Sequence, residues 1–188
     1  VPGPGTQSLR RGPLVEAGIY VVTVIMGKER SSKRIVVEED PRIALPAAAL
    51  AARHRAIMQT YELSRTALLT LQKISRLRES VSEVLRSPRS VASPDAVRKK
   101  AVEFSKSVDG LLARFIAPRL PNAPSETSRP TIIQRLGRLG SDLDGYTSAP
   151  TAAQMEEIES LSDLVEETAA TIEELMETGQ VQLDLRIN

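Results

Sequence analysis

Carboxylates are the most frequent chemically reactive side chains toward the end of this 188-residue sequence. They recur at intervals of three, four or seven residues, which places them on one face of a helix: Glu156, Glu159, Asp163, Glu166, Glu173 and Glu177. Such carboxylates can hold a pair of metal ions in a helix bundle, but that site also needs inward-facing Glu-x-x-His pairs. The sequence has one histidine and no such pair. The stripe is therefore interpreted as a solvated helix face.

Two shorter clusters of charged residues could also bind ligands. Asp142 and Asp144 lie near Gly145 and loosely resemble a calcium-binding loop, but the series of oxygen ligands in such loops is incomplete here. The basic cluster Arg98–Lys100 could contact phosphates or lipid headgroups. No aromatic stripe accompanies this cluster, so a solvated helix face is the preferred interpretation.

The only histidine, His54, lies on a predicted helix beside Leu50, Ile57 and Tyr61, which follow heptad spacing. A lone histidine on a bundle helix resembles the site of histidine phosphotransfer domains, in which the imidazole receives a phosphoryl group. Those domains place a lysine and a small residue shortly after the histidine, whereas Arg55 follows here and no equivalent lysine exists. We interpret His54 as a packed or rim residue and keep phosphotransfer as a remote alternative.

The familiar catalytic constellations are absent from the sequence. Without cysteine there is no thiolate nucleophile, thiolate metal site or disulfide. The patterns G-x-S-x-G, G-K-[ST] and H-E-x-x-H do not occur. Two Phe, three Tyr and no Trp argue against aromatic platforms for sugars or single-stranded nucleic acid. We therefore expect a protein that is not an enzyme, with no catalytic, cofactor-binding or metal-binding residues.

The net charge of +1 conceals a strong asymmetry along the chain. Residues 1–120 hold 21 Lys and Arg against 11 Asp and Glu, a net charge of +10. Residues 121–188 hold 4 against 13, a net charge of −9. A basic half could indicate nucleic acid or an anionic membrane surface. We prefer a basic helical layer that packs beside an acidic one, and we expect no nucleic-acid partner.

The first part of the chain predicts a linker and a hairpin. Residues 1–13 are rich in Pro and Gly and read as an irregular linker. Residues 14–42 contain two β-prone runs, Ile19–Ile25 and Lys33–Glu38, separated by a turn. A lone hairpin is marginally stable in water. We expect it to pack on the helices, on the linker or on strands that this sequence does not contain.

Residues 46–188 follow a helical period and predict an α-helical bundle. Breaks at Ser87-Pro88, 117–129 and Ser148–Thr151 divide it into about four helices, the last of which is expected to end at Gly179. Short loops favour an up-down antiparallel bundle, so the fold class is mainly α with a preceding β-hairpin. The predicted inner stripes are Leu50, Ile57, Tyr61, Ala67, Leu68, Leu71, Ile74, Val81 and Leu85; Val97, Ala101, Phe104, Val108, Leu111 and Phe115; Ile132, Leu136, Leu139, Leu143 and Tyr146; and Met155, Ile158, Val165, Ala169, Ile172 and Met176.

Several segments resemble the C-terminal part of bacterial sortilin-like proteins built on BNR-repeat β-propellers, which are often labelled glycosyl hydrolases. The resemblance rests on the strand Ala17–Val24, the turn Gly27-Lys28 and the segment Asp40–Arg42. It also rests on Leu136–Leu139 and on the sequence APTAAQ at Ala149–Gln154, which opens the last helix. The order and spacing of these segments carry more weight than any one of them.

The resemblance covers residues 12–188 and implies that the hairpin is the last one of an immunoglobulin-like β-sandwich. Ser31–Arg34 departs from the family pattern, which is more apolar there, and this leaves the packing partner of the hairpin open. The chain starts Val-Pro-Gly-Pro-Gly, and Val1 is interpreted as a cut end. Any hydrolase chemistry would belong to an upstream propeller.

These observations predict a non-catalytic structural or interaction module. The chain would be a scaffold or docking subunit, or the tail of a larger exported protein, and its partners would be proteins in an assembly or its own upstream domains. The alternative is an accessory domain of a BNR-propeller glycosyl hydrolase. The resemblance implies a periplasmic or extracellular location. No apolar run reaches the roughly 20 residues needed to span a bilayer, although peripheral membrane contact is open.

Overall fold

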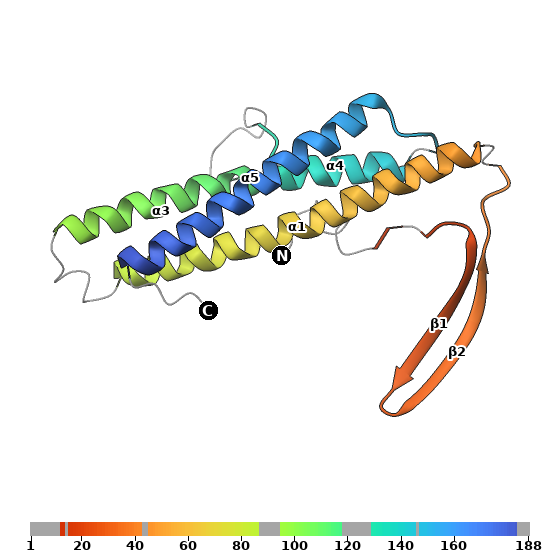
Figure 1. The fold of residues 1–188 in the computed structure, drawn as a ribbon, viewed down its shortest axis with the longest axis horizontal. Coiled ribbons are helices and arrows are strands. Elements are labelled where there is room, and N and C mark those ends of the chain that lie inside the picture. Colours follow the sequence, from red (N-terminus) through yellow and green to blue (C-terminus); the bar gives the residue numbers. More distant parts are fainter. Residues whose placement is uncertain are drawn as a thin grey trace.

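Among the residues that the structure describes, a β-hairpin is followed by four helices (Figure 1). The computed structural model describes residues 12–13, 15–42, 45–86, 95–117, 129–145 and 147–183, with the side chains of 95–97 and 180–183 excepted. Its elements are, in chain order, β1 (Gly18–Met26), β2 (Glu29–Val37), α1 (Ala47–Arg86), α3 (Asp95–Phe115), α4 (Ile132–Gly145) and α5 (Ala152–Leu183). The predicted mainly α-helical fold with a preceding β-hairpin is confirmed.

Helix α1 is the central element, because α3, α4 and α5 all pack against it. Neither Gly nor Pro interrupts its 40 residues. Both α3 and α4 run antiparallel to α1, one after the other, whereas α5 runs alongside in the same direction as α1 (Figure 1). The predicted up-down alternation therefore holds for α1, the pair α3 and α4, and α5, but not between α3 and α4 themselves, which share one direction. Side-chain contacts agree with these directions: Arg53, early in α1, bonds to the end of α4, and Lys73 later in α1 pairs with Glu173 late in α5.

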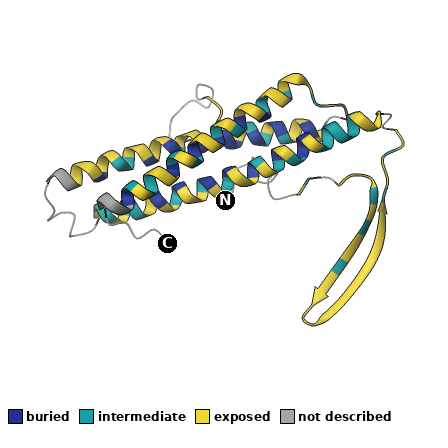
Figure 2. Ribbon diagram, in the orientation of Figure 1, coloured by how far each residue is buried: buried dark blue, intermediate teal, exposed yellow. Residues whose placement is uncertain are grey.

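The core lies along the inner stripes of the four helices, where the dark blue residues of Figure 2 gather. Most of the predicted stripe residues are buried: Ile57, Ala67, Ile74, Val81, Ala101, Val108, Leu111, Phe115, Ile132, Leu136, Leu139, Leu143, Ile158, Val165 and Ile172. Leu77 and Leu161 are completely buried as well and were not predicted. Aliphatic packing thus replaces the aromatic contacts that this composition lacks.

Two details of the helical prediction were wrong. Met155 is 41% exposed, because the first turn of α5 is largely open to solvent. Gly179 is a buried residue inside α5 and does not end the helix, which continues to Leu183 with further apolar residues. Val97 and Tyr146, also assigned to the stripes, lie outside the described side chains.

Helices α4 and α5 begin with the same motif, P-T-x-x-Q. The backbone N–H of Thr131 donates to Gln134 Oε1 at 2.9 Å, and Gln134 N donates back to Thr131 Oγ1 at 3.4 Å. At α5 the corresponding distances between Thr151 and Gln154 are 2.9 and 3.2 Å. These are capping boxes, which satisfy backbone donors that have no partner inside the helix. They fix where each helix starts.

The acidic helix α5 is held by cations from all three other helices. It carries nine Asp and Glu and no Lys or Arg. The pairs are Lys73 of α1 with Glu173, Arg114 of α3 with Glu167, and Arg135 of α4 with Glu157. Part of the charge asymmetry of the sequence is therefore compensated within the fold.

Small side chains allow α1 and α4 to approach closely. A Cβ atom on Gly140 of α4 would lie 4.0 Å from Thr60 Cγ2 of α1. The buried hydroxyls on this part of α1 bond to their own helix: Thr60 Oγ1 donates to Ala56 O at 2.8 Å and Ser64 Oγ donates to Thr60 O at 2.7 Å. Their polar atoms are thereby satisfied without a partner on α4.

The close approach predicts opposite effects for two substitutions at Gly140. Gly140→Ala should raise the free energy of unfolding by about 0.5–1 kcal/mol, because alanine favours the helix and its Cβ meets Thr60 at an ordinary contact distance. Gly140→Leu should lower it by about 1–3 kcal/mol through overpacking. Urea unfolding followed by helical circular dichroism measures both. Equal effects of the two variants would contradict the close approach.

The Arg135–Glu157 pair predicts a pH-dependent contribution to stability. Both guanidinium distances to the carboxylate are 2.8 Å, and hydrogen bonding to Arg135 holds the pKa of Glu157 below its ordinary value of 4.5. The contribution is therefore present above about pH 4.5 and is lost as the pH falls through the lower folded pKa. Glu157→Gln should cost about 0.5–1 kcal/mol at neutral pH and little in acid. The matched control is Glu159→Gln, at an exposed position without an ion pair in the described region, and it should show no such pH dependence.

Candidate functional site

Within the described structure, the β-hairpin is the part that packs least against the rest of the chain. Strands β1 and β2 pair antiparallel, with Gly18 opposite Val37 and Met26 opposite Glu29. The turn between them is Gly27-Lys28, and Gly27 adopts a φ of 60°, which suits a two-residue hairpin turn. The register assigns every side chain of the hairpin to one of two faces.

The two faces differ in composition. What we call the threonine face carries Ile19, Val21, Thr23 and Ile25 of β1, opposite Val36, Arg34, Ser32 and Arg30 of β2. The tyrosine face carries Tyr20, Val22, Val24 and Met26, opposite Ile35, Lys33, Ser31 and Glu29. Thr23 and Ser32 share a hydrogen bond of 2.8 Å. Strand β1 is thus apolar on both faces, while most of β2 is polar or basic.

These apolar side chains are exposed. In the part of the chain that the structure describes, neither strand packs against a helix, and the hairpin projects from the beginning of α1 (Figures 1 and 2). Eight large hydrophobic residues of the hairpin are exposed: Ile19, Val21, Val22, Val24, Ile25, Met26, Ile35 and Val36. Singly exposed apolar residues are ordinary, but a contiguous group of them marks an interaction surface.

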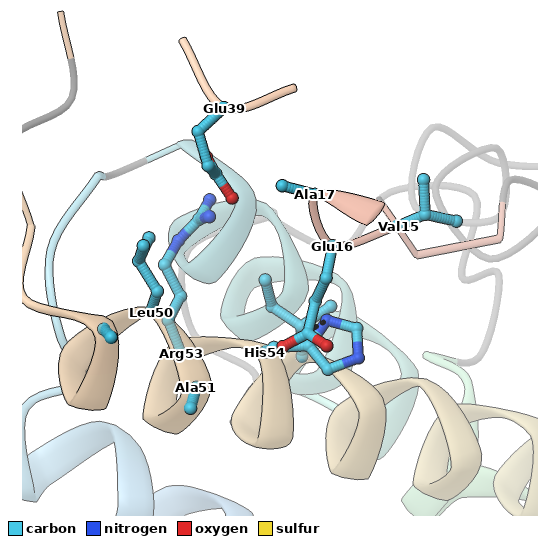
Figure 3. A pocket seen from close by; sticks show the side chains of 10 residues that line it. Val15, Glu16, Ala17, Glu39, Leu50, Ala51, Arg53 and His54 are labelled. Carbon is cyan, nitrogen blue, oxygen red and sulfur yellow. Dashed lines mark ion pairs between the residues drawn. The ribbon is translucent and has the colours of Figure 1, made fainter. Parts of the chain in front are cut away.

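The base of the hairpin touches α1 around an open pocket of about 310 Å³ (Figure 3). Glu16, just before β1, lies with Oε1 4.0 Å from Nδ1 of His54. Glu39, just after β2, points toward Arg53 (Figure 3). Tyr20 donates its hydroxyl hydrogen to the carbonyl of Glu16 at 2.8 Å, which braces the start of β1. Both ends of the hairpin therefore approach the same turn of α1.

Arg53 links this turn to α4. Its Nε donates to the carbonyl of Leu143 and its Nη2 to the carbonyl of Asp144, both at 3.1 Å. Carbonyls in the last turn of a helix lack partners within the helix, so a cation there caps α4 and complements its dipole. Arg53 thus forms a structural contact between the two helices.

The other charged candidates lie at different places in the fold. His54 lines this pocket as a rim residue, with its side chain 29% exposed, and it contacts Glu16. Asp142, Asp144 and the cluster Arg98–Lys100 are exposed on their helices. Among the described residues no group of three or more His, Asp or Glu could hold a metal ion.

The acidic stripe of α5 divides between packing and solvent. Glu173 pairs with Lys73, whereas the other five members are exposed and have no ion pair in the described region: Glu156, Glu159, Asp163, Glu166 and Glu177. The interpretation as a solvated face fits these five. The described helices include none that is long and apolar enough to cross a membrane.

Sequence reasoning overlooked two features near these sites. The capping boxes were signalled by the repeated P-T-x-x-Q pattern at Thr131 and Thr151. The role of Arg53 had no sequence signal, because its partners are backbone carbonyls 90 and 91 residues away.

Comparison of the chain with protein-family models, curated proteins and solved structures found no match. The resemblance to sortilin-like propeller proteins therefore stays a prediction. The hairpin surface is the candidate site on structural grounds alone.

The exposure of the hairpin predicts that its apolar residues contribute nothing to the stability of the bundle. The double variant Val24→Thr, Ile25→Thr should change the free energy of unfolding by less than about 0.5 kcal/mol, because both side chains are more than 60% exposed. Leu77→Ala, at a fully buried position, should cost about 2–5 kcal/mol. Thermal unfolding monitored at a helical wavelength makes the comparison. A large loss in the double variant would show that the hairpin packs on the bundle.

Proposed function

We propose that this chain is a non-catalytic structural and interaction module. The helical bundle is the scaffold, and the hairpin is the docking element through which it joins protein partners. The observation that carries the proposal is the group of eight exposed apolar residues on two strands that no described helix covers. Burying apolar surface is the main favourable term in protein association.

The attachment of the hairpin supports this role. Glu16 contacts His54 of α1 at the base of the hairpin, Tyr20 braces the start of β1 on the Glu16 carbonyl, and Arg53 in the same turn of α1 joins α1 to α4. A partner bound to the hairpin would therefore be held against the bundle at this end. The chain would act as a scaffold subunit or as the tail of a larger exported protein, in the periplasmic or extracellular location that the resemblance implies.

The accessory-domain alternative uses the same surface with a different partner. In that case the hairpin would complete the β-structure of a BNR-propeller hydrolase, and catalysis would belong to that protein. Turnover measured on the full gene product with and without residues 14–188, which include the hairpin, separates the two. Unchanged turnover would reject an essential accessory role.

The interaction proposal predicts that association depends on the hairpin. A tagged chain, gently extracted from its native cells and analysed by native mass spectrometry, should carry bound protein. The variant Ile19→Thr, Val24→Thr, Ile25→Thr should lose it, because three exposed apolar contacts are removed. The matched control, Glu159→Gln and Glu166→Gln on the solvated face of α5, should retain it. Wild-type protein that carries nothing bound would contradict the proposal.

A further inference from the structure

The unpaired edge of β1 is the part of the hairpin best suited to pair with another strand. Within the described residues the sheet has only two strands, so each strand has one unpaired edge. Strand β2 carries Arg30, Lys33 and Arg34, and charges of this kind protect an edge against further pairing. Strand β1 has no charge, no proline and no bulge from Ile19 to Met26. An added strand therefore belongs beside β1.

The register shows which backbone groups of β1 are available. Met26 and Glu29 flank the two-residue turn and so form a hydrogen-bonded pair, after which bonded and non-bonded pairs alternate. The N–H and C=O groups of the odd-numbered residues consequently face away from β2: Ile19, Val21, Thr23 and Ile25. These groups form a regular row that a second strand can pair with.

We propose that the occupant of this edge is a second copy of the same chain, with the two β1 strands antiparallel about a two-fold axis at Val22. This inference rests on the proposed function and names the partner. In this register Val21 lies opposite Thr23 of the second copy, so that odd-numbered residues pair with each other. Ile19 lies opposite Ile25 in the same way. The available backbone groups are therefore matched on both strands, and the facing side chains are β-branched, which favours the pairing.

The charges at the two ends of the hairpin favour the same arrangement. Residues 27–34, at the tip, carry four Lys and Arg and one Glu, a net charge of +3. The segments 15–17 and 38–42, at the base, carry four Asp and Glu and one Arg, a net charge of −3. Antiparallel pairing brings each basic tip to the acidic base of the other copy. With the axis at Val22, Lys28 falls opposite Glu16 of the second copy.

The resulting sheet has four strands in the order β2, β1, β1, β2. Its outer edges are both β2, whose basic residues prevent further growth, so the assembly closes as a dimer. Two-stranded hairpins are marginal in water, whereas sheets of three or more strands gain stability. Pairing thus gives the hairpin the neighbours that its own chain does not supply.

Sedimentation of the purified full chain over a hundredfold range of concentration tests the proposal. Wild-type protein should show a concentration-dependent monomer–dimer equilibrium. Val22→Lys should weaken dimerisation by at least about tenfold, because it places two like charges opposite each other at the axis. The matched control is Ser31→Lys on β2, which adds the same charge at an exposed position on the same face, away from the axis, and should leave the dimer intact. Helical circular dichroism checks that each variant is folded.

A charge exchange tests the register. Lys28→Glu and Glu16→Lys should each weaken the dimer, and the two substitutions together should restore it. Failure of restoration, or equal effects of Val22→Lys and Ser31→Lys, would overturn the two-fold pairing at Val22.

The result also separates this inference from the proposed function. A wild-type chain that stays monomeric throughout overturns self-pairing. If the hairpin variants then still lose protein bound in native extracts, the edge of β1 serves a different β-structured partner and the interaction role stands. If they lose nothing, both proposals fail.

Discussion

The packing of three helices on α1 is the constraint on which the rest of this structure depends. Because α3 and α4 follow each other along α1, neither could bury its apolar stripe without that continuous surface. The buried hydroxyls of Thr60 and Ser64 on α1 are compatible with the core because each bonds to a carbonyl four residues earlier. No described buried side-chain N or O atom lacks a hydrogen-bond partner. The core can therefore include these hydroxyl groups without leaving a buried polar atom unpaired.

The ion pairs between helices contribute more to the arrangement of the helices than to the free energy of unfolding. The pairs Lys73–Glu173 and Arg114–Glu167 join partners that are each roughly half-exposed, and pairs of that kind contribute little free energy. These pairs instead affect the orientation of α5. Because α5 has no Lys or Arg of its own, its acidic residues pair with basic residues of the neighbouring helices. Apolar contacts such as Leu161 and Val165 hold α5 in place, and the ion pairs select its rotation about its own axis.

The features that depend on local patterns were predictable from the sequence, and those that depend on distant contacts were not. Heptad spacing identified Ile74 and Val81 as core, and β-branched runs identified the hairpin. Periodicity could not show that Met155 lies in an exposed first turn, because exposure there depends on whether other helices pack against it. The contact of Arg53 with α4 pairs a side chain with backbone carbonyls, which have no sequence signature. The exposure of the hairpin could not be predicted either, because it depends on whether distant segments of the chain pack against the strands.

The uninterrupted length of α1 has a geometrical consequence. Forty helical residues span about 60 Å, and with neither Gly nor Pro inside it this helix has no position at which a hinge is favoured. The hairpin is attached at one end, while the end of α1 and the start of α3 lie at the other (Figure 1). Helix α1 therefore keeps its first turns, beside the base of the hairpin, at a fixed distance from its own C-terminal end.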